Sequence, residues 1–328
     1  MYNEAIQEAS TARERSSVVP SPTIPKVAIL LACYNGERFL AEQLQSIIQQ
    51  SHDNWMIVAS DDGSCDGTLA LLLRYQQQLG EHRLRVIAGP RRGFAANFMS
   101  LISTPFICAE YFAFCDQDDI WHIDHLSKAI AWMQSADPSV PALHCGRTRL
   151  IRENGQPFGV SPLFPRAPSF KNALVQSIAG GNTMVFNHSA KQLLERTASL
   201  PIVSHDWWAY LLVSGTGGRV NYSASPSVDY RQHGGNLVGS NSSLKDRLHR
   251  IRRMFAGHFQ SWNETNIESL HHCREMLSEE SLRRFQAFAR ARRSPLPLRL
   301  WRISRSGVYR QTVPGNLGLL LAALLGKL

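Results

Sequence analysis

One segment of the chain, Tyr111-Phe-Ala-Phe-Cys-Asp-Gln-Asp-Asp-Ile-Trp121, changes from apolar to acidic at a single step. Its apolar half predicts a buried strand that ends at the edge of a sheet, where open α/β sheets bind their ligands. Asp116, Asp118 and Asp119 then repel one another unless a cation or several donors compensate their charge. Carboxylate oxygens suit Mg²⁺ or Mn²⁺. The alternative is an acidic start to the next helix, with Asp119 or Asp124 as its cap.

The composition is that of a globular protein with a basic C-terminal part. The chain has 328 residues, of which 44% are hydrophobic and 19% are charged, and its net charge is +9. Arginine is concentrated between Lys245 and Arg310. This indicates either an anionic partner, nucleic acid or a membrane surface, or a solvated basic face. The six cysteines form no CxxC pair, which predicts buried free thiols and a reducing cytoplasm.

The first 140 residues alternate between strands and helices. Continuous apolar runs predict strands at Lys26–Ala32, Trp55–Ser60, Leu84–Ala88 and Tyr111–Cys115. Apolar residues at helical spacing predict helices at Glu37–Gln50, Asp66–Leu79, Gly93–Ile102 and Asp124–Met133. Such alternation is typical of an α/β fold with a mostly parallel sheet. Further strands are expected at Ala142–Ile151, Thr183–Phe186 and Arg219–Tyr222, and a helix at Ser204–Val213.

Three of these strands end in polar loops, at Tyr34-Asn35-Gly36, Asp61-Asp62-Gly63-Ser64 and Asp116–Asp119. Parallel strands bring such loops to one edge of the sheet, where they would form a crevice of nucleotide size with acidic walls. The phosphate-binding patterns GxGxxG and GxxxxGK followed by Ser or Thr are absent. A divalent cation held by carboxylates is the remaining common way to bind a diphosphate.

With these motifs in order, the sequence resembles the family 2 glycosyltransferases of the inverting GT-A type. Within that family it is similar to bacterial rhamnosyltransferase-like enzymes that act on surface polysaccharides. The motifs are Val27–Gly36, Asp61–Thr68, Asp116–Trp121, His205–Trp208 and Tyr230–Asn236. The resemblance implies a GT-A catalytic domain, Rossmann-like and binding a nucleotide-diphospho-sugar, at residues 26–240. It lies between a mobile leader at 1–25 and a basic amphipathic helical region at 241–328.

The resemblance also implies roles for individual residues. The nucleotide sugar would lie against Ala32, Tyr34, Glu37, Asp61, Asp62, Gly93, Asn97, Asp116 and Gln117, and Asp62 would accept from its pyrimidine ring. Mg²⁺ or Mn²⁺ would be held by Asp116, Asp118 and His233, with Asp118 as the direct ligand. Asp206 would be the catalytic base. The pocket for the acceptor and the sugar would include Gly181, Asn182, Trp207 and Trp208.

Such an enzyme moves a hexose, with rhamnose among the candidates, from a dTDP- or UDP-sugar to a hydroxyl of a surface polysaccharide or a lipid-linked glycan. The cation stabilises the charge that develops on the departing diphosphate. One carboxylate deprotonates the acceptor hydroxyl. A single displacement inverts the configuration of the anomeric carbon, so that one base is enough.

Structural alternatives exist for each of these residues. Asp62 could be only a turn residue, and Asp206 only an N-cap. Trp207 and Trp208 fit a core as well as a sugar platform, and a loop histidine such as His233 could bond to backbone instead of a metal. Two other activities also remain open, a nucleotidyltransferase and a non-enzymatic nucleic-acid-binding protein. An acidic crevice would repel the phosphates of a nucleic acid, so no nucleic-acid partner is expected.

Helices are expected throughout the C-terminal part. Leu244–Phe255 reads as a basic amphipathic helix, and a second helix is expected at Ser278–Arg292. The apolar run Leu317–Leu325 is shorter than the roughly 18 residues that a spanning helix needs. Together with Trp301 and its neighbouring arginines, it suggests a peripheral contact with the anionic inner face of the cell membrane. The alternative is a helical subdomain that packs on the catalytic domain or on a second subunit.

Overall fold

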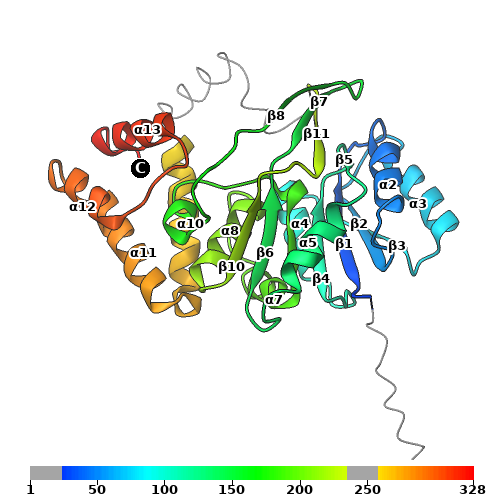
Figure 1. Cartoon of the computed structure of the whole chain (residues 1–328), viewed down its shortest axis with the longest axis horizontal. Coiled ribbons are helices and arrows are strands. Elements are labelled where there is room, and N and C mark those ends of the chain that lie inside the picture. The colour runs from blue at the N-terminus through cyan, green and yellow to red at the C-terminus, as the bar shows by residue number, and fades with distance from the viewer. Residues whose placement is uncertain (1–23, 235–257) are drawn as a thin grey trace, which may run out of the picture.

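The computed structural model describes residues 24–234 and 258–328 (Figure 1). Residues 1–23 of the expected leader and the helix expected at Leu244–Phe255 therefore lie outside the described residues. The following paragraphs concern the described part of the chain.

A seven-stranded sheet forms the centre of the molecule, with the strand order β10-β6-β9-β4-β1-β2-β3. Its strands are β1 (Val27–Cys33), β2 (Trp55–Asp61), β3 (Leu84–Ala88), β4 (Tyr111–Cys115), β6 (Ala142–Gly146), β9 (Val185–Asn187) and β10 (Arg219–Ser223). β1 pairs in parallel with β2 and with β4, whereas β9 runs antiparallel between β4 and β6. The expected α/β fold with a mostly parallel sheet is confirmed.

Helices cover both faces of this sheet. Successive side chains of β4 point to opposite faces, so that Phe112 and Phe114 join one core while Ala113 and Cys115 join the other. The first face is covered by α4 (Phe94–Ile102), α7 (His188–Arg196) and α8 (His205–Gly215), and the second by α2 (Leu40–Ile48), α3 (Thr68–Leu79) and α5 (His125–Met133). Burial on both faces explains why the strands are continuously apolar in the sequence.

A small second sheet, absent from the sequence-based prediction, lies beyond the carboxyl ends of the central strands (Figure 1). Its order is β5 (Ile120–Trp121), β11 (Val228–Gln232), β7 (Arg149–Arg152) and β8 (Pro157–Val160). The single strand expected at Ala142–Ile151 was wrong, because the chain leaves the central sheet after β6 and enters the small sheet as β7. β11 pairs with β5, directly after the acidic segment.

The described tail consists of α10 (His258–His272), α11 (Glu279–Arg292), α12 (Leu298–Ser306) and α13 (Val313–Leu324), gathered at the β10 end of the sheet (Figure 1). Phe285 and Phe288 are buried in the same core as Trp208 of α8. The Ser278 N–H donates to the Gly215 carbonyl at 3.0 Å. The described tail thus packs on the domain that contains the central sheet. No helix within residues 24–234 and 258–328 is long and apolar enough to cross a bilayer.

Because the tail and α8 share one core, a cavity in α11 should destabilise the protein. We expect Phe285→Ala to lower the free energy of unfolding by about 3–5 kcal/mol, measured by denaturant titration. Leu317→Ala, at a side chain 62% exposed, is the control and should change it by less than about 0.5 kcal/mol. Equal effects of the two substitutions would contradict the shared core.

Candidate active site

The three polar loops converge, as the sequence predicted. The Tyr34 N–H donates to Gln117 Oε1 at 2.8 Å, and Gln117 Nε2 donates to the Tyr34 carbonyl at 2.9 Å, which joins the ends of β1 and β4. The Asn35 N–H donates to Ser64 Oγ at 2.9 Å, and the Cys65 N–H donates to Asn35 Oδ1 at 2.9 Å, which joins the ends of β1 and β2. The loops therefore form one continuous polar rim at the carboxyl edge of the sheet.

The carboxylates after β2 hold this rim in shape. Asp61 accepts hydrogen bonds from Ser64 Oγ at 2.5 Å and from the Ser64 N–H at 3.2 Å. Asp62 accepts from the backbone N–H groups of Arg91 at 2.6 Å and Gly93 at 2.9 Å, and so ties β2 to the loop after β3. These bonds support the turn-residue interpretation of Asp62, and its contact with a pyrimidine ring stays a prediction.

Glu37 and Ala32 lie on the same rim. Glu37 Oε2 accepts from the Gly67 N–H at 2.9 Å, next to the N-terminus of α3. Ala32 is half-buried near the end of β1, and the Tyr34 side chain is exposed. These residues lie at the place where the resemblance puts the nucleoside.

The three aspartates after β4 differ in how their charge is compensated. Asp119 is buried, and its carboxylate accepts from Asn182 Nδ2 at 2.5 Å and from the Arg231 N–H at 3.1 Å. Asp118 Oδ2 lies 2.7 Å from His233 Nε2. None of the described residues donates a hydrogen bond to the carboxyl group of Asp116. Asp124 occupies the N-cap position of α5 without a side-chain cap bond, whereas Asp119 bonds to Asn182 and Arg231 and does not cap this helix.

Negative charge is concentrated around Asp116. Burial, followed by the charges of Asp118 and Asp206, raises the pKa of the Asp116 carboxyl group to about 8. Burial, followed by the charges of Asp118 and Asp116, raises the pKa of Asp119 well above its usual value. Asp206, from the distant helix α8, is therefore close enough to act on the end of β4.

Arg231 on β11 organises this acidic end, and the sequence analysis gave it no role. Its side chain is 1% exposed and donates to the Asp118 carbonyl at 3.0 Å, to the Glu153 carbonyl at 2.8 Å and to Glu42 Oε2 at 2.7 Å. It thus connects β4, the turn between β7 and β8, and α2. Its position two residues before His233 was the available signal, because residues i and i+2 of a strand share one face.

Asp206 lies in the first turn of α8 and is half-buried. Its Oδ1 accepts from the adjacent Trp207 N–H at 2.7 Å, whereas the N-cap residue Ser204 makes no side-chain cap. Its carboxylate therefore both stabilises the helix start and acts electrostatically on Asp116. Its role as a base stays a prediction.

Several residues expected near the ligand are buried and bond within the protein, and their contact with a ligand stays a prediction. The indole N–H of Trp207 donates to the Ala173 carbonyl at 2.6 Å and that of Trp208 to Thr197 Oγ1 at 3.0 Å, so both rings lie in the core. Asn182 bonds to Asp119, and Asn97 accepts from Ser60 Oγ at 2.6 Å. The two tryptophans are buried because α8 is apolar on nearly all sides, as in a helix surrounded by protein.

Gly181 leaves no space for a side chain next to His205. It has no positive φ, but a Cβ atom there would lie 2.2 Å from Nε2 of His205. The His205 ring is buried and stacks on Phe98 with a centroid distance of 3.8 Å. Gly181 therefore makes room for the residue directly before Asp206.

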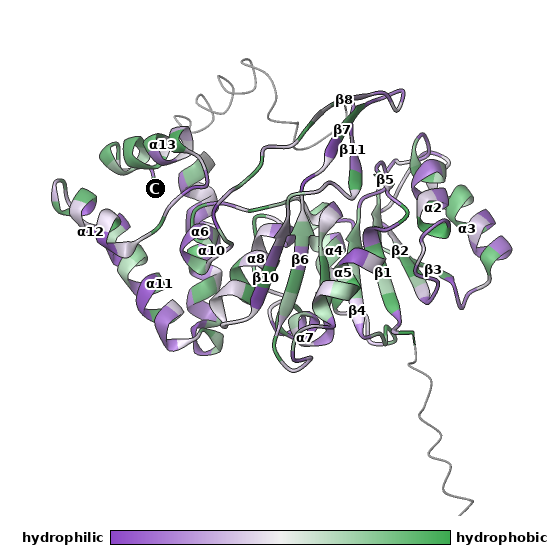
Figure 2. Ribbon diagram, in the orientation of Figure 1, coloured by the Kyte–Doolittle hydropathy of each residue, from purple (hydrophilic) through white to green (hydrophobic). Residues whose placement is uncertain are grey.

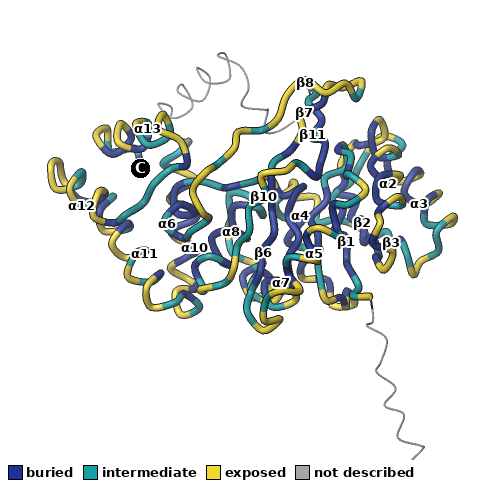
Figure 3. The backbone as a smooth tube through the Cα atoms, in the orientation of Figure 1, coloured by how far each residue is buried: buried dark blue, intermediate teal, exposed yellow. Residues whose placement is uncertain are grey.

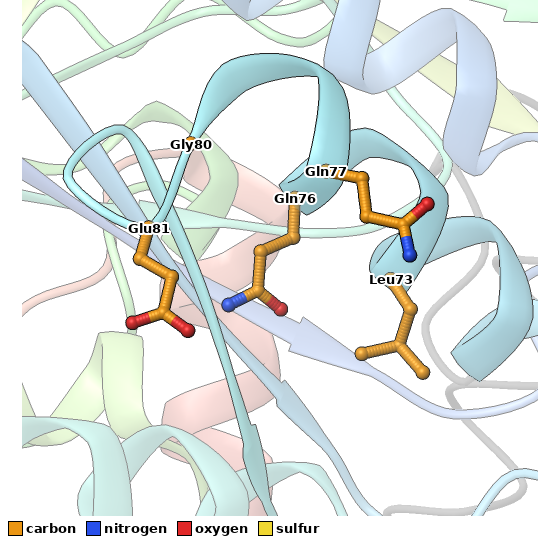
Figure 4. A pocket seen from close by; sticks show the side chains of 5 residues that line it. All are labelled: Leu73, Gln76, Gln77, Gly80 and Glu81. Atoms are coloured by element: carbon orange, nitrogen blue, oxygen red, sulfur yellow. The ribbon is translucent and has the colours of Figure 1, made fainter.

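The structure also contains a hollow far from this edge. It is lined by Leu73, Gln76, Gln77, Gly80 and Glu81, at the end of α3 and in the turn before β3 (Figure 4). β3 runs parallel to its neighbour β2, so this turn lies at the opposite edge of the sheet from the polar rim. The hollow is not part of the candidate site.

The residues at the acidic edge fit a divalent cation that is completed by substrate. Within the described residues, no three His, Cys, Asp or Glu side chains form a ready-made metal cluster. Mg²⁺ is commonly held by one or two carboxylates together with substrate phosphates. The uncompensated Asp116 and the partly exposed Asp118 supply oxygen donors of this kind.

The comparison with known sequences defines the family. A model of the family described as Glycosyl transferase family 2 matches residues 28–193, and the chain belongs to this family. The chain is 28% identical to the dTDP-rhamnosyl transferase RfbG of Shigella flexneri over 232 residues, which cover 67% of this chain and 78% of RfbG. It is 26% identical over 107 residues to the UDP-Glc:alpha-D-GlcNAc-diphosphoundecaprenol beta-1,3-glucosyltransferase WfgD of Escherichia coli, covering 33% of this chain and 40% of WfgD.

Solved structures support the GT-A fold. S. aureus TarS 1-349 in complex with UDP-GlcNAc has a TM-score of 0.52 and 15% identity, covering 92% of this chain and 88% of that chain. GalNAc-T7 with UDP, GalNAc and Mn²⁺ has a TM-score of 0.52 and 12% identity, covering 88% of this chain and 56% of that chain. The protein is therefore a glycosyltransferase with a GT-A fold.

The contact between Gly181 and His205 can be tested by one methyl group. Gly181→Ala should displace the His205 ring and shift Asp206, because an alanine Cβ cannot lie 2.2 Å from a ring atom. We expect a loss of glycosyl transfer of at least about tenfold, since small misplacements of reacting groups are costly. Gly159→Ala is the control, because its Cβ would lie in ordinary contact, 3.7 Å from Leu150 Cδ1. Wild-type transfer by the Gly181 variant would contradict this.

A raised pKa of Asp116 has a defined consequence for the metal-free protein. Its pKa rises on folding from 3.8 to about 8, so its contribution to stability is present at low pH and is lost as the pH rises through about 8. We expect Asp116→Asn to become more stable relative to wild type between about pH 5 and pH 8, measured by denaturant unfolding in EDTA. Asp137→Asn is the control, because the pKa of exposed Asp137 is lowered and its charge does not change in that range. A difference for Asp116→Asn that is independent of pH contradicts the prediction.

Proposed function

We propose that this glycosyltransferase moves a hexose, with inversion, from a dTDP- or UDP-sugar to a hydroxyl of a surface polysaccharide or a lipid-linked glycan. The observation that carries the proposal is the packing of the first turn of α8 against β4, where the His205 and Phe114 ring centroids lie 4.6 Å apart and, besides burial, the charge of Asp206 raises the pKa of Asp116. This packing brings a possible base towards the residues that would hold the leaving group. The names of two relatives, a dTDP-rhamnosyl transferase and a glucosyltransferase for a diphosphoundecaprenol-linked sugar, support the classes of donor and acceptor. Rhamnose is the first sugar to test.

In this proposal the donor lies on the polar rim. The loops held by Gln117, Asp61 and Asp62 enclose the nucleoside, and the backbone near Ala32 and Tyr34 borders its ring. Glu37 and Gly93 lie at the periphery of this place. Asn97 supports the rim from below through its bond with Ser60.

The diphosphate is placed beside Asp116 and Asp118, where Mg²⁺ or Mn²⁺ would be bound. When bound, the cation neutralises the charge that develops on the leaving diphosphate. Asp118 is the proposed direct ligand, His233 lies 2.7 Å from its carboxylate, and Asp116 is the second oxygen donor. The presence of Mn²⁺ in the GalNAc-T7 structure supports a divalent ion for the fold.

Asp206 is the proposed base that removes the proton of the acceptor hydroxyl as this oxygen attacks the anomeric carbon. The carbon–oxygen bond to the diphosphate breaks in the same step, so that the configuration is inverted without a covalent intermediate. Gly181 and buried His205 set the position of the first turn of α8. A lipid-linked acceptor would keep the protein at the inner face of the cell membrane.

The proposal is tested by donor hydrolysis and transfer with Mn²⁺ over a panel of dTDP- and UDP-sugars. Asp206→Asn should lower transfer by about 10²–10⁴-fold, because it removes the base but keeps the shape of the side chain. Asp118→Ala should abolish the dependence of donor hydrolysis on Mn²⁺. Asp137→Asn, an exposed aspartate elsewhere, is the matched control and should keep wild-type rates. Normal transfer by either site variant means that the assignment is wrong.

A further inference from the structure

Helix α13 presents an apolar face that no described residue covers. The helix contains no charged residue, and Leu319, Ala322 and Ala323 pack it against the rest of the tail. The opposite side, called here the leucine face, consists of Val313, Leu317, Leu320, Leu321, Leu324 and Leu325. All six side chains are exposed, and Leu317 reaches 62%. Figures 2 and 3 show α13 as a largely hydrophobic helix with an exposed outer side.

The leucine face is held in a fixed orientation. Arg299 of α12 donates to the Ala323 carbonyl at 3.0 Å and to the Ser294 carbonyl at 2.9 Å. Arg292 of α11 donates to the Leu328 carbonyl. At its start, α13 is capped by Thr312, which accepts from the Gly315 N–H. The exposed leucines therefore belong to a rigid part of the fold.

The tail that carries this face is strongly basic. Residues 281–328 contain ten Arg and Lys and no Asp or Glu. On α12, Trp301 is 56% exposed, and the Arg305 guanidinium lies 5.0 Å from the centre of its ring. Leucines that enter the acyl boundary, with Trp and Arg at headgroup level, are the arrangement of proteins that lie on a membrane.

We propose that the leucine face, with the adjoining side of α12, docks the protein on an anionic lipid surface. Charge selects this partner over a second copy, because two copies of a segment with ten cations and no carboxylate would repel each other. In Figure 1, α13 lies on the same side of the molecule as the carboxyl ends of the central strands. A lipid-linked acceptor would approach the carboxyl ends of these strands from the same side, and in this respect the inference rests on the proposed function.

This surface differs from the basic helix expected at Leu244–Phe255, which lies outside the described residues. It includes the apolar run Leu317–Leu325, for which the sequence already suggested a membrane contact, and the structure adds that Leu317, Leu320, Leu321 and Leu324 form one exposed face of α13. Apolar contact and charge then contribute separately to lipid binding. Substitution of the leucines removes the apolar contribution, and neutral lipid or high salt removes the electrostatic contribution.

The test is flotation of the full chain with vesicles of equal parts phosphatidylglycerol and phosphatidylcholine. Wild type should float with these vesicles and much less with pure phosphatidylcholine. We expect Leu320→Gln with Leu324→Gln to weaken binding by at least about tenfold, because two leucines no longer enter the lipid. The control is Leu69→Gln with Leu73→Gln on α3, a pair with the same spacing and similar exposure, 43% and 45%, against 45% and 47% for the α13 pair. This control should bind like wild type.

Three outcomes would overturn the inference. Undiminished vesicle binding by the α13 variant excludes the leucine face. A wild-type dimer in sedimentation that the variant converts to a monomer, without vesicle binding by either, assigns the face to a second copy. A large loss of folding stability in the variant without vesicles assigns it to another segment of the same chain. Donor hydrolysis, measured in parallel, separates this inference from the proposed function: hydrolysis without vesicle binding refutes only the docking, and the reverse refutes only the enzyme assignment.

Discussion

The structure depends on how it compensates three carboxylates at the end of one buried strand. Asp119 is satisfied by Asn182 and by the Arg231 backbone, and Asp118 lies beside His233. None of the described residues donates a hydrogen bond to the Asp116 carboxyl group, and Asp206 adds further negative charge. The charge that remains uncompensated is the part available to a cation and a diphosphate. The fold therefore separates an aspartate that maintains the structure from those that can bind a ligand.

Arg231 connects this charge balance to the architecture. A buried guanidinium requires several acceptors, and Arg231 finds them on three separate segments, at Asp118, Glu153 and Glu42. The small sheet that carries Arg231 is consequently held over the carboxyl edge of the central sheet. His233 follows Arg231 by two residues, directly after β11, and its Nε2 lies 2.7 Å from Asp118 Oδ2.

The C-terminal helices extend the same principle of shared burial. α11 places Phe285 and Phe288 in the core that contains α8, so the tail supports the helix on which Asp206 lies. At the outer side of the tail, α13 exposes the leucine face. The C-terminal helices thus pack on the central domain on one side, and on the other side α13 leaves the leucine face uncovered by the described residues.

Much of the fold could be predicted from the sequence, because periodicity and loop chemistry are local. The strands at Leu84–Ala88 and Tyr111–Cys115 were predicted with their observed bounds, and the convergence of the three polar loops was also predicted. The small sheet could not be predicted, since only Arg147 and Thr148 lie between β6 and β7, and the change of sheet at this point has no turn signal in the sequence. For Trp207 and Trp208 the sequence left the core and a platform equally open, because burial of a side chain depends on partners that are distant in the chain.

The sequence alone determined the class of fold, the polar edge and the candidate carboxylates, because each is encoded in a short contiguous motif. Only the tertiary structure decided which aspartate has hydrogen-bond donors for its carboxylate, and that Arg231 connects three segments at the site. It also decided which side of α13 remains uncovered. The first two of these properties depend on contacts between residues that lie 63 to 189 positions apart in the chain, from Asp119 with Asn182 to Glu42 with Arg231. No local pattern specifies such pairs, since each is formed only when the strands and helices pack.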